Sequence, residues 1–555
     1  MAEAPKSLKG EYRLLKKCTV LFVSCLGSLV LNAHAEYTVN VPLTPVQDWL
    51  QSDSPSDCGL PELRTQKLHE ALAELYQAQG YIFIWKNQGL LQDLLEQLAE
   101  LQSDGLNPAQ YMPDIREAEA LCAELQISAH YLLALEHLSR GRLNQQEHEP
   151  VWESSAMMTP IRESVAQLGI LGLESMRNAF EHARPDLPLY LQLRDAFIAM
   201  PEAGPELPPF PDGPLLKPGN DRDPRLRVLM QHMQLRGLLD PEATAGPLDR
   251  PLLADDPVQA QPLSYDQVLQ EAVRQFQRQQ GLQPDAVVGP QTLAALNMTH
   301  AQRLQQVRIN LERMRWMEAR RQYHSLLVNA AGSRALLLEG NEVRWQSRVQ
   351  SGSPDRATPM LDSRINRVTL NPSWTIPPTI LKEDKLPQIR SNPAYFSERN
   401  MQVLDHQGNQ LDPAQIDWHN PRGILLRQPP GPDNPLGRMV FRFDNPFAVY
   451  LHDTPSQSLF ARAVRNVSSG CVRVEQASEL ADYLFYTLDQ QQRERIEQRM
   501  TSGRTHEIAV RNGPQVLLTY WTAEALEDGS LRFSPDPYSM DEPLAQAYHR
   551  AIAQQ

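Results

Sequence analysis

The spacing of apolar residues changes once along the chain, from a helical period to an alternating one. Between about residues 60 and 200, Leu, Ala, Glu and Gln recur at helical spacing, most clearly over 89–101. From Tyr323 onward the apolar residues alternate, and the segments 323–329 and 343–349 are typical of antiparallel strands. The chain is therefore expected to be an α+β multidomain protein, mainly helical at first and β-rich afterwards.

Length and Pro/Gly content indicate several domains. The 555 residues are too many for one hydrophobic core, so two to four domains are expected. The stretch 201–224 is dense in Pro and Gly, which marks a boundary. A helix is expected over 301–317. The basic face that includes Arg313 and Arg315 could hold a carboxylate, but it is expected to be solvated.

The N-terminus is typical of an export signal. Five basic residues precede an apolar run from Val20 to Leu31, and Ala-His-Ala at 33–35 has the small-x-small cleavage pattern. The apolar run is short for a membrane span, which favours cleavage over a retained anchor. Glu36 is therefore expected to be the first residue of the mature chain.

Charge and composition argue against several classes of function. The net charge is −14 and the pI is about 5.5, which argues against nucleic acid as a partner. The 14 histidines are scattered, and we find neither a metal-spaced His/Cys cluster nor a Gly-rich phosphate loop. No metal and no other cofactor is therefore expected.

The five cysteines fall into two groups. Cys18 and Cys25 belong to the predicted signal and would leave with it. Of the other three, Cys58 and Cys122 could pair in an oxidising compartment, which would leave Cys471 as a free thiol. Two unrelated reduced thiols agree equally well with the sequence, which does not establish the pairing.

Cys471 follows a Ser-Ser-Gly turn, nineteen positions after His452. The segment 449–451 alternates β-branched and aromatic residues, which predicts a short strand with His452 at its end. A thiol with an imidazole to accept its proton has the parts of an activated nucleophile. Arg473 could lower the pKa of the thiol through its positive charge. Gly470 allows close approach of the backbone, and N–H groups beside it could stabilise an oxyanion.

The same residues also fit a structural role. A Cys beside small residues is commonly a buried core thiol, and a His at a strand end is commonly a hydrogen-bonded structural residue. Composition and spacing alone therefore leave both interpretations open.

His452, fifteen intervening residues and then Ser-Ser-Gly-Cys-Val-Arg resemble the signature of the L,D-transpeptidases, whose catalytic domain is called YkuD-type. Many members have a second His where this chain has Ser469, whereas S-S-G-C-V-R is the usual form in the large, scaffold-bearing YcbB-like branch. The resemblance implies that Cys471 is the nucleophile and that His452 is the general base, oriented by a backbone carbonyl. Arg473 and Tyr450 are our candidates for positioning residues.

Other segments resemble parts of the same branch. Residues 135–144 resemble its helical scaffold, 301–317 its connecting helix and 356–359 its Thr-Pro turn. Residues 368–378 resemble its substrate-cleft segment, in which Trp374 is expected either to stack on a peptide stem or to fill the core.

Residues 268–296 resemble a three-helix peptidoglycan-binding module. The order A-V-x-x-F-Q from Ala272, Gly-Leu at 281–282 and V-G-x-x-T from Val288 matches its hallmark. Only Ala286 departs, where the usual residue is Gly. Most of these residues are expected in the core, so the residues that contact glycan remain unassigned.

These comparisons lead to a predicted domain order. We expect a signal peptide over 1–35, a helical scaffold over 36–222, the peptidoglycan-binding module over 223–300, a connecting helix over 301–320, a β-rich catalytic domain over 321–512 with a capping insert at 379–437, and a closing segment over 513–555.

The resemblance implies a periplasmic enzyme of peptidoglycan biosynthesis, with a role in cell-wall biogenesis and cell shape. It would form 3→3 cross-links between diaminopimelate residues through a thioester on Cys471, with release of D-Ala, and a carbapenem would acylate the same thiol. Gly470, Ser469, Arg473, Tyr450 and Trp374 would hold the oxyanion or position substrate. Peptidoglycan stems and glycan are the expected partners, together with other cell-wall synthases. An L,D-carboxypeptidase and a non-catalytic wall-binding scaffold are the alternatives.

Overall fold

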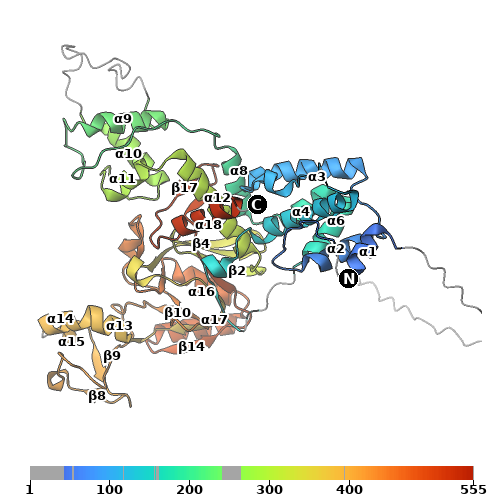
Figure 1. Cartoon of the computed structure of the whole chain (residues 1–555). Helices are drawn as coiled ribbons and strands as arrows, with labels where there is room; N and C mark the ends of the chain where they lie inside the picture. The colour runs from blue at the N-terminus through green and yellow to red at the C-terminus, as the bar shows by residue number, and fades with distance from the viewer. Residues whose placement is uncertain are drawn as a thin grey trace, which may run out of the picture. The chain divides into compact units, whose positions relative to one another are not determined.

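The computed structural model describes residues 43–52, 56–116, 118–155, 157, 162–240, 264–392 and 394–553. The predicted signal peptide at 1–35 lies outside the described residues. Helices make up the first part of the described chain, and strands make up most of the part after residue 323 (Figure 1). The expected α+β multidomain class is therefore confirmed.

The N-terminal helices enclose a core of their own. α2 and α3 each bury one apolar face, as their spacing predicts, and α4 is buried along most of its length because α2, α6 and α7 pack around it. The helices of this region are α1 (Pro45–Gln51), α2 (Leu68–Ala78), α3 (Gln88–Glu100), α4 (Ala120–Arg140), α5 (Gln145–His148), α6 (Val165–Glu174), α7 (Met176–Ala183) and α8 (Pro188–Ile198).

A disulfide joins the segment before α2 to the start of α4. Cys58 and Cys122 form this bond, and Cys471 is a free thiol. The structure therefore settles the pairing that the sequence left open.

The segment predicted to be a peptidoglycan-binding module has a separate small core. Ala272, Val273 and Phe276 are buried on one face of α10, as expected. Ala286 has a backbone φ of +61°, a conformation that Gly adopts more readily, which explains why Gly is usual at this position. The helices are α9 (Arg225–Leu235), α10 (Gln267–Gln279) and α11 (Pro290–Leu296).

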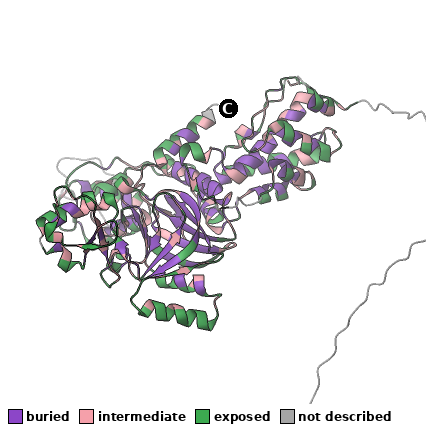
Figure 2. Cartoon of the chain, turned by 90° about the horizontal axis from the view of Figure 1, so that it is seen from below, coloured by how far each residue is buried: buried purple, intermediate pink, exposed green. Residues whose placement is uncertain are grey.

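The β-rich part is built on one sheet that closes on itself. The pairings run in the order β5, β10, β11, β13, β4, β3, β2, β15 and back to β5. Apolar side chains of these strands form a continuous buried core, which appears purple in Figure 2. The strands are β2 (His324–Asn329), β3 (Arg334–Glu339), β4 (Glu342–Gly352), β5 (Leu361–Leu370), β10 (Met439–Phe443), β11 (Leu451–His452), β13 (Val472–Val474) and β15 (Gln515–Thr519).

Shorter elements surround this sheet. β15 belongs to the predicted closing segment, yet it pairs with both β2 and β5, so that segment is an integral part of the sheet. The remaining elements are β1 (Trp152–Glu153), β12 (Asn466–Ser468), β14 (His506–Ala509), β16 (Ala523–Ala525), β17 (Leu531–Phe533), α16 (Ala477–Phe485), α17 (Gln490–Thr501) and α18 (Asp541–Ala553).

The polar stretch predicted as a capping insert has its own sheet and core. Its strands pair in the order β6, β9, β7, β8, and Trp374, Tyr395 and Leu426 are among its buried residues. This unit begins at β6, a few residues before the predicted start of the insert. Its elements are β6 (Trp374–Thr375), α13 (Pro378–Ile380), a π-helical turn (Leu381–Lys385), α14 (Leu386–Ser391), α15 (Tyr395–Glu398), β7 (Gln402–Leu404), β8 (Gln410–Leu411) and β9 (Leu425–Gln428).

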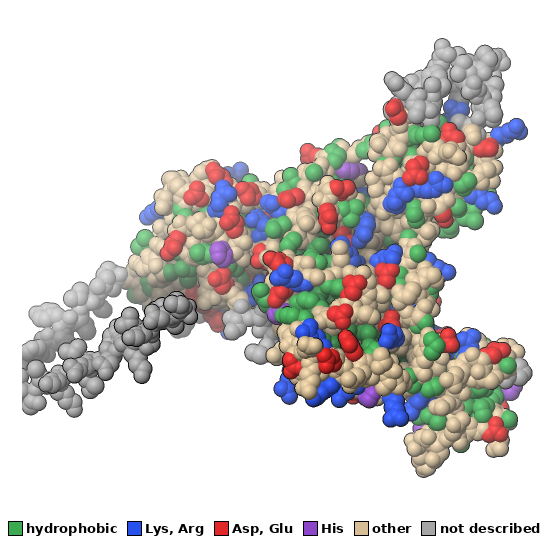
Figure 3. All heavy atoms as spheres, turned by 180° about the vertical axis from the view of Figure 1, so that it is seen from behind, with side chains coloured by type: hydrophobic (Ala, Val, Ile, Leu, Met, Phe, Trp, Pro, Cys, Tyr) green, Lys and Arg blue, Asp and Glu red, His purple; other side chains and the backbone are tan. Residues whose placement is uncertain are grey.

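The surface carries charges of both signs. Acidic and basic side chains are interspersed on the face shown in Figure 3. No described helix has both the length and the apolar character that a membrane span requires. Within the described residues, no group of three or more His, Cys, Asp or Glu is arranged to hold a metal ion.

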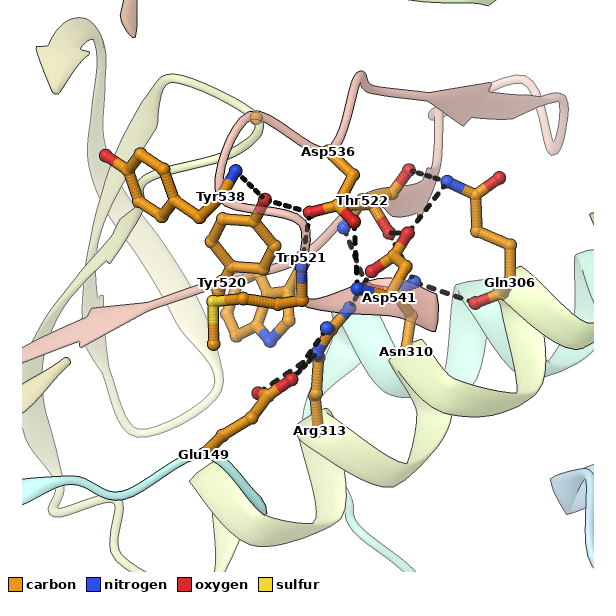
Figure 4. A network of polar contacts seen from close by, with 12 residues as sticks. Glu149, Gln306, Asn310, Arg313, Tyr520, Trp521, Thr522, Asp536, Tyr538 and Asp541 are labelled. Carbon is orange, nitrogen blue, oxygen red and sulfur yellow. Dashed lines mark hydrogen bonds and ion pairs between the residues drawn. The ribbon is translucent and has the colours of Figure 1, made fainter. Parts of the chain in front are cut away.

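The connecting helix α12 (His300–Glu318) is buried, and the expectation that its basic face is solvated is wrong. Arg313 is 3% exposed and Arg315 is fully buried. Arg313 forms ion pairs with Glu149 at 2.7 Å and with Asp541 at 2.6 Å (Figure 4). Because α12 packs between the N-terminal helices and the closing segment, its guanidinium groups must pair with buried carboxylates.

Candidate active site

His452 is the last residue of β11, and Cys471 directly precedes the adjacent parallel strand β13. In the β11–β13 pair, Leu451 is opposite Val472 and His452 is opposite Arg473. Leu451 and Val472 are fully buried in the core of the sheet. Because side chains alternate along a strand, His452, Arg473 and Cys471 share the other face. The register therefore places the predicted base and the predicted nucleophile side by side, diagonally across one strand pair.

His452 is held as a neutral imidazole. Its Nδ1 lies 2.6 Å from the backbone carbonyl oxygen of Asp453, so Nδ1–H donates to that carbonyl and Nε2 is left as the acceptor. Burial, reinforced by the charge of Arg473, lowers the pKa of His452 to about 3. The imidazole is therefore unprotonated at neutral pH, as a general base must be. The Asp453 carboxylate instead accepts from the N–H of Arg438 at 2.8 Å.

Cys471 is a protonated thiol in this conformation. Its Sγ donates to the carbonyl oxygen of Ala448 at 3.7 Å. Burial raises the pKa of Cys471, and hydrogen bonding with Tyr450 and the charges of Arg473 and Arg442 only partly oppose this effect. The positive charge of Arg473 acts as expected, but desolvation outweighs it. The resting pair is therefore a thiol and a neutral imidazole, and the thiolate must form as the proton moves to His452.

Tyr450 lies beside both groups. Its ring centroid is 5.7 Å from that of His452, and the Arg442 guanidinium carbon is 5.2 Å from the centre of the same ring. Burial and the neighbouring Cys471 raise the pKa of the Tyr450 hydroxyl, which therefore stays protonated and can donate a hydrogen bond toward the sulfur.

The loop that carries the thiol depends on Gly470. Gly470 has a backbone φ of +107°, in the range that favours glycine. Its N–H donates to Ser468 Oγ at 3.2 Å, and its carbonyl oxygen accepts from Thr358 Oγ1 at 2.9 Å. The N–H of Gly470 is thus occupied, whereas the N–H of Cys471 has no acceptor within the described part of the chain. The backbone donor left for an oxyanion is that of Cys471.

Ser469 links this loop to the capping insert through Arg356. The Arg356 Nη1 donates to Ser469 Oγ at 2.9 Å and to the Asp384 carboxylate at 2.7 Å. The Nη2 of the same guanidinium donates to Glu383 at 2.6 Å. Asp384 and Glu383 belong to the π-helical turn of the insert, so one arginine contacts the residue next to Gly470 and the insert at once.

Arg473 has a side-chain donor, Nε, that is unpaired within the described residues. Its Nη1 donates to Gln350 Oε1 at 3.1 Å. Its Nε, like the Nε2 of Gln350, is buried and has no partner among the described residues. Leaving such buried donors unpaired costs folding free energy.

Trp374 is not brought to the thiol. It is 9% exposed within the core of the capping insert, and the Lys385 Nζ lies 5.6 Å from the centre of its ring. The structure therefore favours the core role over stacking on substrate. Tyr450 packs against the same hydrophobic cluster, so the core of the insert borders the site indirectly.

Four residues that contact the candidate site were not predicted as site residues from the sequence. Arg356 and Thr358 lie in the segment that resembles the Thr-Pro turn of the family, which was the available signal for them. Arg442 and Ala448 precede His452 along the chain but have no distinctive spacing. Their contacts with the site arise only from the pairing of β10 with β11 and from the turn between these strands.

Three segments match known families. Residues 323–488 match the L,D-transpeptidase catalytic domain (YkuD), residues 70–197 match the scaffold domain, and residues 256–296 match a family described as a putative peptidoglycan-binding domain.

One curated protein and several solved structures are similar to parts of this chain. The chain is 34% identical over 244 residues to a Haemophilus influenzae protein named "Putative L,D-transpeptidase"; the match covers 43% of this chain and about half, 49%, of that relative. A solved L,D-transpeptidase from Mycobacterium smegmatis is 14% identical, with 36% of this chain and 58% of that chain covered and a TM-score of 0.17. One from Xylanimonas cellulosilytica is 16% identical, with 56% and 98% covered and a TM-score of 0.17.

The fold and the site define a modular α+β protein whose closed sheet carries a free thiol beside a neutral imidazole. The sequence matches agree with this architecture: residues 323–488 match the L,D-transpeptidase catalytic domain, and the same chain also matches a scaffold domain and a putative peptidoglycan-binding domain. The resemblance stated from the residues of the motif is thereby confirmed.

Proposed function

We propose that this chain is a peptidoglycan L,D-transpeptidase that forms 3→3 cross-links between diaminopimelate residues. The observation that carries the proposal is that neutral His452 ends β11 and Cys471 directly precedes the adjacent strand β13, inside the segment that matches the catalytic family. The predicted domain order, with a signal peptide at 1–35, fits a periplasmic enzyme that acts on the wall.

The first half-reaction is acylation. His452 Nε2 accepts the proton of Cys471 as Sγ attacks the carbonyl carbon of the diaminopimelate residue at stem position three. The thiol must rotate from Ala448 toward the imidazole, a change that substrate entry would favour because catalytic hydrogen bonds often tighten only in the complex. The C–N bond to D-Ala then breaks, the imidazolium protonates the leaving amine, and a thioester remains.

Three groups are placed to assist this step. The free N–H of Cys471 is the candidate oxyanion donor, and the Tyr450 hydroxyl can donate to the sulfur while it is anionic. The half-buried guanidinium of Arg473 is our candidate for binding a carboxylate of the stem and so orienting it. In this assignment Gly470 shapes the loop rather than donating to the oxyanion.

The second half-reaction transfers the acyl group to an amine. An acceptor stem amine attacks the thioester carbonyl, His452 takes a proton from the amine and returns it to the sulfur, and the cross-link is released. Water competes with the amine, so closure of the capping insert favours transfer. Arg356 is suited to hold that closure because it contacts both Ser469 and the insert.

The proposal is tested by analysis of muropeptides. Wild-type protein incubated with tetrapeptide-bearing muropeptides should produce 3→3 dimers, whereas Cys471→Ala should produce none while its melting temperature changes little. Incubation with a carbapenem should add its mass to wild-type protein only. His452→Gln tests the general base in the same assay. Its control is His406→Gln, which alters an exposed histidine of the capping insert.

Two outcomes would favour the alternatives. Tripeptide products without dimers would make the protein an L,D-carboxypeptidase. No adduct and no product from folded protein with a reduced Cys471 would favour a non-catalytic wall-binding scaffold. Association with other cell-wall synthases is proposed only from the resemblance.

A further inference from the structure

A cavity of about 560 Å³ lies beside β3 and β4, and its charged lining is mostly basic. Glu475 is the one carboxylate among the described residues that line it. Ala335 and Val349 are buried in the core of the sheet, so the residues that precede them in β3 and β4 point to the opposite face. The lining contains neither His452 nor Cys471 and no residue of the capping insert. Its basic residues are Arg334, Arg348, Arg465 and Arg532.

The arginines of this cavity repel one another. Arg334 and Arg348 are register partners in the β3–β4 pair, so two like charges stand directly opposite each other. The pKa of Arg465 is lowered to about 10, first by burial and then by the charges of Arg348 and Arg532. Like charges brought together in this way cost folding free energy unless anions neutralise them. The cavity therefore has the electrostatics of an anion site.

Internal carboxylates neutralise two of these four charges. Arg348 forms an ion pair with Glu475, and Arg532 forms one with Glu524. Glu524 is 3% exposed and does not line the cavity, so it acts on Arg532 from within the protein. The side chains of Arg348 and Arg532 are 51% and 28% exposed, so each can still reach a bound anion.

Arg334 and Arg465 supply the charge that no acid neutralises. Neither has an acid partner in the described part of the chain. Arg465 donates to backbone carbonyl oxygens, among them that of Ser333 at 3.1 Å, which fixes its position but leaves its charge. Arg334 donates from Nη2 to Gln346 Oε1 at 2.6 Å. Its Nε and Nη1 have no acceptor among the described residues, and neither atom is buried, so both are accessible to a carboxylate.

We propose that this cavity binds the carboxylates of a peptidoglycan stem peptide, and that this stem is not the one that reacts with Cys471. A stem that contains diaminopimelate carries several carboxylates, which complement the two arginine charges that remain. Cys471 and Glu475 are four residues apart along β13, so the backbone at the cavity is about 13 Å from that at the thiol. This inference rests on the proposed function, because that function supplies the stem.

Phosphate is the other anion that arginine binds well. Residues 323–488 match a catalytic family of peptidoglycan chemistry, and residues 256–296 match a putative peptidoglycan-binding domain. A chain held on the wall meets stem carboxylates at high local concentration. The cavity is therefore assigned to carboxylates, and inorganic phosphate becomes one arm of the test.

A second site for a stem predicts an effect on substrates that carry several stems. Binding of one stem in the cavity would raise the concentration of its neighbours at the thiol without contacting the reacting atoms. Loss of the site should therefore raise KM for wall fragments with several stems and leave kcat unchanged. Acylation of Cys471 by a carbapenem should proceed as before.

The test measures binding of the free tetrapeptide stem to the full chain after a carbapenem has blocked Cys471. Arg334→Gln removes an unneutralised charge and should weaken binding about fivefold, whereas Glu475→Gln removes the competing carboxylate and should strengthen binding about threefold. Arg495→Gln and Glu494→Gln make the same charge changes at exposed positions of α17, and both controls should bind as wild type does. A stem whose carboxylates are converted to amides should bind wild type about tenfold more weakly.

Several results would overturn the assignment. These are equal binding of the free and the amidated stem, unchanged binding in folded Arg334→Gln, weaker binding in Glu475→Gln, or displacement of the stem by an equal concentration of inorganic phosphate. Carbapenem labelling of Cys471 separates this test from that of the proposed function. Normal labelling with weaker stem binding in Arg334→Gln supports the cavity assignment. Absent labelling in wild type refutes the enzyme proposal alone, and stem binding is then compared among the same variants with the thiol unblocked.

Discussion

His452 should make the folded protein sensitive to acid, and Gln at this position should remove that sensitivity. The imidazole is 4% exposed, and its pKa falls from 6.5 to about 3 on folding. A base with a depressed pKa binds its proton more readily in the unfolded state. Its contribution to stability is therefore fully present above pH 6.5 and is lost progressively as the pH falls toward about 3.

The size of the effect follows from these two pKa values. With 6.5 in the unfolded state and about 3 in the native state, this one group should lower the free energy of unfolding by about 2 kcal/mol between pH 7 and pH 5. Any native pKa well below 5 gives nearly the same difference, because the native imidazole is then neutral at both pH values. The prediction therefore depends on burial and on the Arg473 charge, which keep the proton away.

Urea unfolding followed by circular dichroism at pH 7 and pH 5 measures this difference. Wild type and the control His406→Gln should lose stability by similar amounts, and His452→Gln should lose about 2 kcal/mol less over the same interval. His452→Gln also loses packing at both pH values, so only the change between them is compared. If wild type and His452→Gln show the same dependence on pH, the imidazole is not held neutral by the fold and the argument for the resting pair is refuted.

Three other substitutions test separate features. Gly470→Ala has room for its Cβ, with the nearest atom at 3.8 Å, so the strained φ alone should cost about 1–3 kcal/mol and slow acylation of the thiol, as urea unfolding and mass spectrometry would reveal. Arg356→Gln removes the ion pair with Asp384 and should weaken closure of the capping insert by about 1 kcal/mol. The ratio of hydrolysis to cross-linking should then rise about fivefold, measured as the ratio of tripeptide to dimer. An unchanged ratio would refute this role of Arg356. Replacing both Cys58 and Cys122 with Ser opens a loop of 64 residues and should cost about 4 kcal/mol in urea unfolding, with carbapenem labelling of the folded protein retained.

The sequence by itself determined the class of fold and the two central residues of the candidate site. Helical spacing before residue 200 and alternation after Tyr323 reflect periods of 3.6 and 2, which local geometry imposes on any chain. The motif from His452 to Arg473 is short and its spacing is specific, so it could be recognised without a structure. The positions of Cys471 and its neighbouring glycine are part of this motif, whereas the free state of the thiol followed only from the Cys58–Cys122 disulfide in the structure.

Only the tertiary structure decided the environments of these residues. The protonation of Cys471 depends on desolvation by packed neighbours, which outweighs the nearby charge of Arg473 that the sequence makes visible. The basic face of α12 was predicted to be solvated because a helical pattern does not reveal partners such as Glu149 and Asp541, which lie 164 and 228 residues from Arg313 in the sequence. Burial and pairing are sums over contacts between distant residues, so the order of residues alone does not determine them.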